Sequence, residues 1–208
     1  MLEDHPFSFS SSALDHEQIA VTIKAAGDFT RSVDDVAPGT PAYVEGPHGA
    51  FSIDRYDGEG YVFVAGGVGI TPIMSMLRTL ADRGDARRHL LICGAPSVDH
   101  LTFEEDLEAM RERLQLRIVY VLSSPSPDWR GETERFDVAL LDRHLPRERA
   151  AHTYFVCRPP QMMDAVESAL RHTGGTLAEQ LHGALRHGLT RPASPGGGPC
   201  VISTPLAS

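Results

Sequence analysis

The feature that most constrains this chain of 208 residues is a glycine-rich turn between an apolar run and a helical pattern. The run from Tyr61 to Ala65 is wholly apolar, and the turn that follows it reads Gly66-Gly67-Val68-Gly69-Ile70-Thr71-Pro72. Glycines allow the backbone to turn tightly and to approach a ligand closely. A helix that begins at such a turn offers free N–H groups and the positive end of its dipole. The turn therefore predicts a phosphate-binding junction, although on the motif alone a tight connection without a ligand remains open.

The elements after the turn predict a parallel α/β sheet. Apolar runs alternate with segments of helical periodicity, and such alternation is typical of strands connected by helices that cover both faces of the sheet. Thr71 and Thr102 are expected to cap two of the helices, with Pro72 at the first helical position of its helix. The expected strands are 61–65, 89–93, 116–122 and 152–157, and the expected helices are 71–83, 102–113, 137–143 and 161–171.

The first third of the chain has a different character. Residues 18–24 alternate between apolar and polar side chains and predict a strand, the turn at 27–30 is placed to open a short helix, and residues 42–45 predict a second short strand. We therefore expect three regions: residues 1–57, residues 58–172 with the parallel sheet, and a divergent tail at 173–208. Within the tail, residues 177–185 are compatible with a helix, whereas the Pro-, Gly- and Ser-rich segment 191–199 predicts disorder.

Composition narrows the classes of function. The formal net charge is −9, so nucleic acid is not an expected partner. The three cysteines have no paired spacing, which favours a reducing compartment, and neither they nor the histidines predict a metal site. Residues 60–77 lack charge over nearly the length of a membrane span, but the glycines and the proline in the middle favour a strand, turn and helix instead.

Five segments together resemble the ferredoxin–NADP reductase superfamily, most closely its ferric reductase and NADPH oxidase branch. The stretch 64–72 is similar to the nicotinamide-binding turn of that family. The other four segments follow the order of the family's flavin, flavin-pyrophosphate, flavin-loop and C-terminal nicotinamide motifs. They are His5-Pro6-Phe7-Ser8, Ile23-Lys24 with Gly27-Asp28-Phe29-Thr30, Glu45-Gly46-Pro47-His48-Gly49, and Phe155-Val156-Cys157 with Pro159-Pro160.

The resemblance implies a fold, cofactors and site residues. It implies a partial antiparallel β-barrel that binds FAD, followed by the α/β domain that binds NADPH or NADH. Ser8 would hydrogen-bond near the hydride-accepting nitrogen of the flavin, and Cys157 would lie near the nicotinamide ring. The remaining residues that it implies for cofactor binding are His5, Pro6, Phe7, Ile23, Lys24, Gly27, Phe29, Thr30, Gly66, Gly67, Val68, Gly69, Ile70, Thr71, Pro72 and Pro159.

Four departures from the family pattern qualify these expectations. Only four residues precede His5, so the first strands of the flavin barrel are expected to be missing, and the segment after His172 does not resemble the family's last strand. Gly94-Ala95-Pro96 replaces a Gly-Ser-Arg segment whose arginine would bind the 2′-phosphate of NADPH, and Arg87 and Arg88 are poor substitutes because they precede the strand. Arg158 stands where the family has glycine.

Three hypotheses about function follow. The first is an enzyme that passes hydride from NAD(P)H to FAD and electrons to heme, ferric iron or an iron–sulfur protein. The second is a non-catalytic dinucleotide-binding fragment that cannot retain flavin. The third, the reductase component of an oxygenase, would need a separate ferredoxin because the chain lacks clustered cysteines. We expect a cytoplasmic location, at the cytoplasmic face of a membrane if a heme-containing membrane domain lies upstream.

Overall fold

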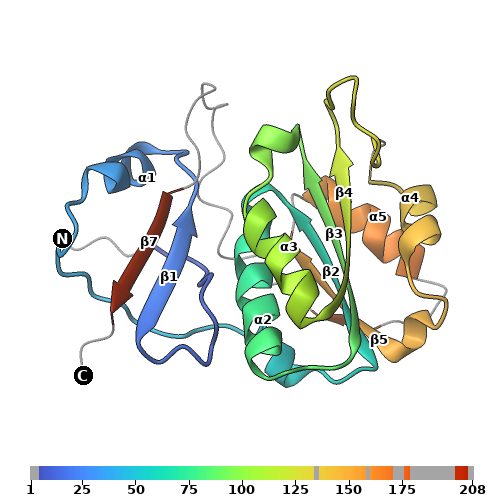
Figure 1. The fold of residues 1–208 in the computed structure, drawn as a ribbon, viewed down its shortest axis with the longest axis horizontal. Coiled ribbons are helices and arrows are strands. Elements are labelled where there is room, and N and C mark those ends of the chain that lie inside the picture. The colour runs from blue at the N-terminus through green and yellow to red at the C-terminus, as the bar shows by residue number, and fades with distance from the viewer. Residues whose placement is uncertain (1–4, 134–135, 158–159, 171–175, 179–199, 206–208) are drawn as a thin grey trace.

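The structure, a computed structural model, describes residues 5–133, 136–157, 160–170, 176–178 and 200–205, and it consists of two parts that lie side by side (Figure 1). One part is a parallel sheet with helices on both faces, and the other is a smaller antiparallel pair of strands. The strands are β1 (Gln18–Ile23), β2 (Gly60–Gly66), β3 (Arg88–Ala95), β4 (Gln115–Leu122), β5 (His152–Cys157), β6 (Thr176–Ala178) and β7 (Cys200–Pro205). The α-helices are α1 (Asp28–Ser32), α2 (Ile70–Asp82), α3 (Glu104–Arg113), α4 (Val138–His144) and α5 (Pro160–Leu170).

The larger part confirms the expected fold class. Its five strands lie in the order β4-β3-β2-β5-β6, and every neighbouring pair is parallel. β2 lies at the centre, and six of its seven residues are buried because β3 and β5 flank it and helices cover it on both sides. A continuous apolar run is what this position in a parallel sheet requires.

Two hydrophobic cores lie on opposite faces of the sheet because successive strand residues point in opposite directions. Phe63 and Ala65 of β2 pack in the cluster that contains the apolar residues of α2 and α3. Val62 and Val64 pack in the cluster that contains those of α4 and α5. Figure 1 shows the corresponding arrangement, with α2 and α3 on one side of the sheet and α4 and α5 on the other.

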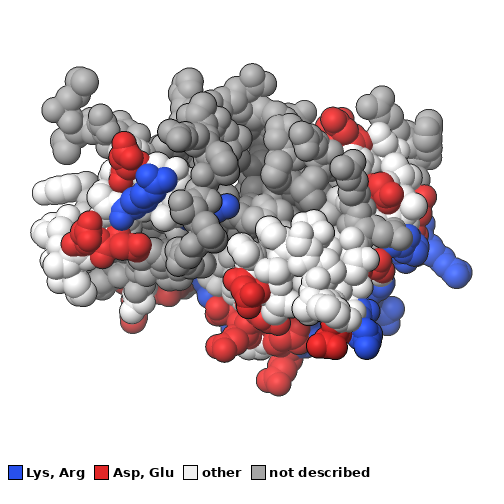
Figure 2. All heavy atoms as spheres, turned by 90° about the horizontal axis from the view of Figure 1, so that it is seen from above, with Lys and Arg blue, Asp and Glu red and all other residues white. Residues whose placement is uncertain are grey.

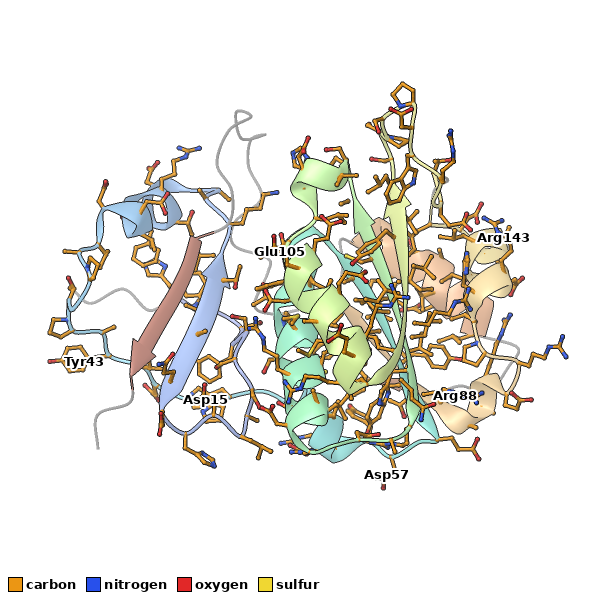
Figure 3. All side chains as sticks on the ribbon, viewed as in Figure 1. Asp15, Tyr43, Asp57, Arg88, Glu105 and Arg143 are labelled. Carbon is orange, nitrogen blue, oxygen red and sulfur yellow. The ribbon has the colours of Figure 1, made fainter. Side chains whose placement is uncertain are left out.

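The smaller part contains a portion of the expected flavin barrel. β1 pairs with β7 in an antiparallel ladder from Gln18 opposite Pro205 to Ile23 opposite Cys200, and Phe9 forms an antiparallel bridge with Val21. The expected strand at 42–45 is wrong. The structure has no strand there, since the described residues give this segment no ladder partner, and the Tyr43 side chain is 99% exposed. Figure 3 shows Tyr43 pointing away from the strands.

The helix starts differ from the sequence prediction in both cases where a threonine was expected to be the cap. α2 begins one residue earlier, with Gly69 at the N-cap position, so Pro72 occupies the third helical position and Thr71 lies inside the helix. α3 begins later, and its N-cap is Phe103 in the left-handed conformation with φ 67°. The short turn of Gly67–Gly69 continues directly into α2, which leaves no extended residue for Thr71 to occupy.

Two short strands lie in the segment expected to be a divergent, disordered tail. Residues 176–178 form the sheet's outer strand β6, so the helix considered for 177–185 is wrong at its start, and residues 200–205 form β7. Both segments find partners that are distant in the sequence, β5 and β1, and local patterns do not reveal such pairing. The segment 191–199 lies outside the described residues.

Candidate dinucleotide site

The glycine turn lies where the carboxyl ends of three strands meet. Gly66 of β2 pairs with Gly94 of β3, and Ala65 of β2 pairs with Cys157 of β5. From β2 the chain proceeds to β3 on one side of the sheet and only later to β5 on the other. Open α/β sheets bind ligands outside the carboxyl ends of the strands at such a change of direction. The position of the turn therefore agrees with a dinucleotide site.

Two glycines of the turn are required for different reasons. Gly67 has a φ of +55°, which other residues rarely adopt, but a Cβ there would meet no atom within 4 Å. A Cβ on Gly69 would lie 2.0 Å from the carbonyl oxygen of Cys157, so only glycine lets α2 begin this close to the end of β5. Gly67 therefore shapes the turn, while Gly69 brings α2 against Cys157.

The outer surface of the turn is open and its inner side is packed. Gly67 and Val68 are exposed, whereas Gly69, Ile70 and Thr71 are buried. The hydroxyl of Thr71 is buried and has no hydrogen-bond partner among the described residues. A buried hydroxyl without a partner costs free energy, which distinguishes Thr71 from the apolar residues around it at the start of α2.

Cys157 lies where the sequence placed it, at the carboxyl end of β5 beside the turn. Its side chain is 4% exposed and packs in the same hydrophobic cluster as Ala65 and Cys93. Its sulfur would be 3.2 Å from a Cβ on Gly69, which places the thiol against the start of α2. Pro159 and Arg158 lie outside the described residues.

The N-terminal motif and the turn at 27–30 come together in an aromatic stack. The rings of His5 and Phe29 are 3.5 Å apart and nearly parallel, at 11°, and the rings of Phe7 and Phe29 are 6.2 Å apart. Phe7 is 37% exposed and Phe29 is 43% exposed, while Pro6 and Ser8 beside them are exposed too. Two segments that are separated in the sequence thus form one open aromatic surface.

The other residues expected at the flavin have distinct local roles. Ile23 is buried, and Lys24 is exposed directly after β1. The Thr30 hydroxyl accepts hydrogen bonds from the N–H groups of Ala26 at 2.9 Å and Gly27 at 2.8 Å. Thr30 therefore holds the turn in shape, and Lys24 and Arg31 are exposed cations beside it, of which Arg31 lies 3.8 Å from the Asp28 carboxylate.

The segment that follows β3 carries acidic rather than basic side chains. Asp99 lies in the short turn Val98–His100, and Glu104 and Glu105 are exposed in the first turn of α3. Figure 2, which looks onto the ends of the strands, shows acidic atoms gathered on the side where α3 lies. The expected arginine is replaced by Ala95-Pro96, so this end of the sheet has acidic neighbours.

Arg87 and Arg88 lie at the other end of the sheet from the glycine turn, as their place before β3 predicts. Arg87 forms an ion pair with Asp85, donates to the carbonyl oxygen of Gly58 at 3.0 Å and lies over the Tyr61 ring, 4.6 Å from its centroid. The hydrogen bonds from Arg87 lower the pKa of the Asp85 carboxyl from its ordinary 3.8 to about 2. Arg88 begins β3, at the end opposite the glycine turn (Figure 3).

A hollow of about 430 Å³ lies elsewhere, along the outer edge of β4. Its polar groups bind one another: Arg117 donates to His144 Nδ1 at 2.7 Å, and His144 Nε2 lies 2.7 Å from a carboxylate oxygen of Glu132. Trp129, the only tryptophan of the chain, donates to the carbonyl oxygen of Glu132 at 3.1 Å. These contacts support the structural role that the sequence predicts for the Trp129 loop.

Sequence reasoning missed one set of polar residues. Ser75, Arg78 and Thr79 of α2 bind the segment Ser10–Ala13 and so join the two parts of the molecule. The signal was present, since these polar residues lie at positions that share one face of a largely apolar helix. What that face contacts could not be read from the spacing.

Residues 63–168 match the family model described as the oxidoreductase NAD-binding domain. The chain belongs to this family. With it the chain belongs to the ferredoxin–NADP reductase superfamily that the motifs indicated. The nicotinamide and flavin cofactors expected from the motifs are those of this group of reductases.

Similar proteins agree with this assignment. The chain is 30% identical over 146 residues to NADH-cytochrome b5 reductase 1 of Debaryomyces hansenii, which covers 69% of this chain and 51% of the relative. It is 30% identical over 139 residues to a flavohemoprotein of Oceanobacillus iheyensis, covering 66% of this chain and 34% of the relative. The chain thus spans about half or less of the length of these relatives.

The solved structures agree on the fold. The cytochrome b5 reductase domain of Ulva prolifera nitrate reductase superposes with a TM-score of 0.64 at 22% identity, covering 73% of this chain and 63% of that domain. In the part of the chain that the structure describes, no helix is both long and apolar enough to cross a membrane.

Proposed function

We propose that this chain binds FAD and NAD(P)H in a reductase that passes electrons to a one-electron acceptor. The observation that carries the proposal is the junction of the glycine turn with Cys157 at the switch point of the sheet, within a chain of the oxidoreductase NAD-binding family. The exposed backbone of this junction supports a dinucleotide site, and the exposed aromatic surface of the smaller part supports a flavin site.

The glycine turn fits the nicotinamide dinucleotide. Its exposed backbone at Gly67 and Val68, at the positive end of the helical run that continues into α2, suits a pyrophosphate. The Thr71 hydroxyl, which has no partner among the described residues, can hydrogen-bond a polar group of the cofactor, and the buried Cys157 near the start of α2 provides an apolar wall. Gly66, Ile70 and Pro72 hold this backbone in shape, and Pro159 completes the proposed set.

The aromatic surface fits the flavin. The exposed rings of Phe7 and Phe29, with the partly exposed His5 stacked on Phe29, form an aromatic surface against which a planar ring system can pack. The exposed Ser8 supplies a hydroxyl beside them, and Lys24 supplies a positive charge for a phosphate. Pro6 and Gly27 define the backbone on either side, while Ile23 and Thr30 support it from the core and the turn. Residues 1–57 are accordingly proposed as part of the FAD-binding region.

The chemistry comes from the cofactors and the geometry from the chain. When bound, the flavin accepts a hydride from the reduced nicotinamide and releases its electrons singly. Ser8 and Cys157 are proposed to lie at the reacting rings, where the Ser8 hydroxyl hydrogen-bonds the flavin edge and the Cys157 side chain excludes water. The glycine turn and the start of α2 hold the pyrophosphate, which orients the nicotinamide.

We propose a preference for NADH. The 2′-phosphate of NADPH needs a nearby cation, but the segment after β3 carries Ala95-Pro96 followed by Asp99, Glu104 and Glu105. Carboxylates repel that phosphate, while an acidic residue can accept a hydrogen bond from the free ribose of NADH.

The acceptor is proposed to be a heme protein. The relatives include one named NADH-cytochrome b5 reductase and one named flavohemoprotein, which support heme as the acceptor class. The motif likeness to the ferric reductase and NADPH oxidase branch supports the same class, with ferric iron or a separate ferredoxin as further possibilities. A cytoplasmic location, or the cytoplasmic face of a membrane, is part of this proposal.

The test is to purify the chain, add FAD, remove the excess and record the flavin spectrum before and after anaerobic addition of NADH or NADPH. We expect bound flavin that is bleached by NADH, with NADPH at least about tenfold less effective, since one lost charge-assisted contact is worth about 1.4 kcal/mol or more. A variant in which Asp99, Glu104 and Glu105 are all replaced by the corresponding amides should show a smaller preference for NADH over NADPH. A chain that binds FAD but is not reduced by either nucleotide would overturn the proposal.

The alternative, a dinucleotide-binding fragment that does not retain flavin, rests on the exposure of the smaller part. Phe7, Phe29 and the 99% exposed Tyr43 lie at its surface, and residues 42–45 have no ladder partner among the described residues. NAD⁺ binding at the glycine turn without any FAD uptake would favour this alternative.

A further inference from the structure

A short segment, Ser10–Ala13, lies between the two parts of the molecule. On one side it is attached to β1: the Ser10 N–H donates to the carbonyl oxygen of Ala20 at 2.7 Å, and the Ser11 hydroxyl accepts from the Ala20 N–H at 3.1 Å. Ser10 is fully buried, and Ser12 is nearly so. Only Phe9 separates the segment from Ser8, so the segment connects the aromatic surface to the element on its other side.

On its other side the segment is bound by one face of α2. The Ser75 hydroxyl donates to the carbonyl oxygen of Ser11 at 2.6 Å, and the Ala13 N–H donates to the Thr79 hydroxyl at 2.9 Å. Arg78 donates through Nη1 to the carbonyl oxygen of Ser10 at 2.6 Å. Positions 75, 78 and 79 share a helix face, so α2 binds the segment along its backbone.

The guanidinium of Arg78 is fixed from a third direction. Its Nη2 donates to a carboxylate oxygen of Asp106 on α3 at 2.7 Å, and it lies over the Phe103 ring at 5.4 Å from the centroid. Its side chain is only 24% exposed, whereas that of Asp106 is 46% exposed. A guanidinium held at both terminal nitrogens has little freedom, so the carbonyl of Ser10 is held in one place relative to α2 and α3.

We propose that Arg78 is a positioning residue, which fixes the segment carrying Ser8 relative to the glycine turn at the start of α2. The inference rests on the proposed function, since positioning matters only if both cofactors bind. Arg78 lies eight positions after Ile70, about 12 Å along the helix, and Ser10 lies two positions after Ser8, about 7 Å in extended chain. Both connections are short, so a shift at Arg78 is transmitted to the distance between the two cofactor surfaces.

The experiment compares R78M with D106N in the full chain. R78M removes the bond to Ser10 but keeps an unbranched apolar stem beside Phe103, and D106N removes the ion pair while leaving the bond to Ser10. With FAD bound, R78M should slow anaerobic flavin reduction by NADH about tenfold or more, because misplacement by 1 Å can cost two orders of magnitude. The affinity for NAD⁺ should stay within about twofold in both variants, since neither changes the glycine turn. D106N should reduce flavin at nearly the wild-type rate, because the amide oxygen in D106N can still accept the hydrogen bond from Arg78 and the bond to Ser10 is kept.

Amide hydrogen exchange supplies a readout that does not need flavin. In R78M the Ala13 amide should exchange about tenfold faster, because the segment is released from α2, while the amides of β2 and β5 keep their protection. R78K, which can restore one hydrogen bond, should recover part of both effects. If the reduction rate and the Ala13 exchange of R78M both equal those of the wild type, the proposal is overturned.

Other results would distinguish a positioning role of Arg78 from a merely structural one. A merely structural role would lower protection in β2 and β5 and NAD⁺ affinity together with the reduction rate, and it would count against positioning. If R78M does not fold, S75A tests the same face with a smaller change, and an unchanged reduction rate and unchanged Ala13 exchange in S75A would overturn the proposal. A wild-type chain that takes up no FAD would overturn the proposed function instead. The comparison of Ala13 amide exchange between R78M and the wild type would then still decide whether Arg78 joins the two parts.

Discussion

The two parts of this molecule differ in where their candidate site residues are held. In the parallel sheet, β2 is buried along six of its seven residues, and the glycine turn continues from it directly into a helix. In the smaller part, β1 begins exposed and becomes buried only at its last two residues, and its aromatic site residues lie at the surface. The glycine turn is attached directly to a buried strand, whereas the aromatic surface lies on the exterior of the smaller part.

The difference teaches that the two cofactor surfaces depend on different interactions. The shape of the glycine turn is set by close packing, because Gly69 lies against the backbone of Cys157. The aromatic surface is held by hydrogen bonds of the segment that follows it, to β1 on one side and to α2 on the other. Substitutions in the parallel sheet should therefore mainly lower the free energy of unfolding. Substitutions in the smaller part should mainly change where the aromatic surface lies.

The largest expected effect is that of a cavity in the sheet. Phe63 is fully buried and stacks on Phe155 with centroids 5.6 Å apart, so F63A should lower the free energy of unfolding by about 4 kcal/mol. Leu14, which is 43% exposed in the smaller part, is the matched control, and L14A should cost less than about 1 kcal/mol. Urea unfolding followed by the fluorescence of the single Trp129 measures both. Equal losses of unfolding free energy in F63A and L14A would contradict the proposed difference between the two parts.

The second largest effect is expected at the glycine turn, where substitution of Gly69 should cost more stability than substitution of Gly67. G69A places a Cβ 2.0 Å from a carbonyl oxygen of the backbone, which must move, and we expect a loss of about 3 kcal/mol together with most of the NAD⁺ affinity. G67A meets no atom within 4 Å, and its cost should be about 1 kcal/mol from the left-handed conformation alone. Urea unfolding and NAD⁺ titration compare the variants. A G67A variant that is the less stable of the two would contradict this account.

The third prediction concerns the end of the sheet opposite the turn. The hydrogen bonds from Arg87 lower the pKa of Asp85 to about 2, so its carboxylate stabilises the folded state above pH 4 and loses this contribution as the pH falls from 4 towards 2. Arg87 is partly exposed, and solvent screening reduces the contribution to about 1 kcal/mol. Unfolding measured between pH 2 and 7 should therefore have a smaller slope in D85N. Identical slopes in the two proteins would exclude this carboxylate as a source of acid sensitivity.

The smallest effect on stability is expected at the aromatic surface. Phe29 is 43% exposed, so F29A should change the free energy of unfolding of the FAD-free chain by less than about 1 kcal/mol. The same variant should weaken FAD binding about tenfold, since a stacked aromatic pair and its buried area are worth about 1 kcal/mol or more. Equilibrium titration with FAD measures this, with V36A, an exposed residue outside the stack, as the control. FAD binding that is unchanged in F29A would place the flavin elsewhere.

The sequence predicted the fold of the sheet well because the signal is local. Residues 61–65, 89–93, 116–122 and 152–157 all lie in strands, and the helices between them were located to within one or two residues. The errors occurred where an element's limits depend on a neighbour. Thr71 and Thr102 are good caps by residue type, but the turn at Gly67–Gly69 and the left-handed Phe103 took the cap positions. Residues 42–45 have the composition of a strand but no ladder partner among the described residues.

Some residues of the candidate site could be predicted from local motifs, and others could not. The sequence identified the turn, the aromatic residues and Cys157, since each carries a recognisable motif. It could not identify Arg78, whose function as a link depends on Ser10 and Asp106, 68 and 28 residues away along the chain. It also gave no reason to expect that residues 176–178 and 200–205 would extend the two sheets.

By itself, the sequence determined that this chain has an α/β nucleotide-binding sheet with a glycine turn after its first parallel strand. Hydrophobic periodicity and glycine content are local properties, and they are sufficient for that conclusion. The tertiary structure decided that Gly69 must be glycine, that His5, Phe7 and Phe29 share one surface, and that α2 joins this surface to the turn. Each of these depends on contacts between segments that are distant in the chain, and residue type alone does not specify such contacts.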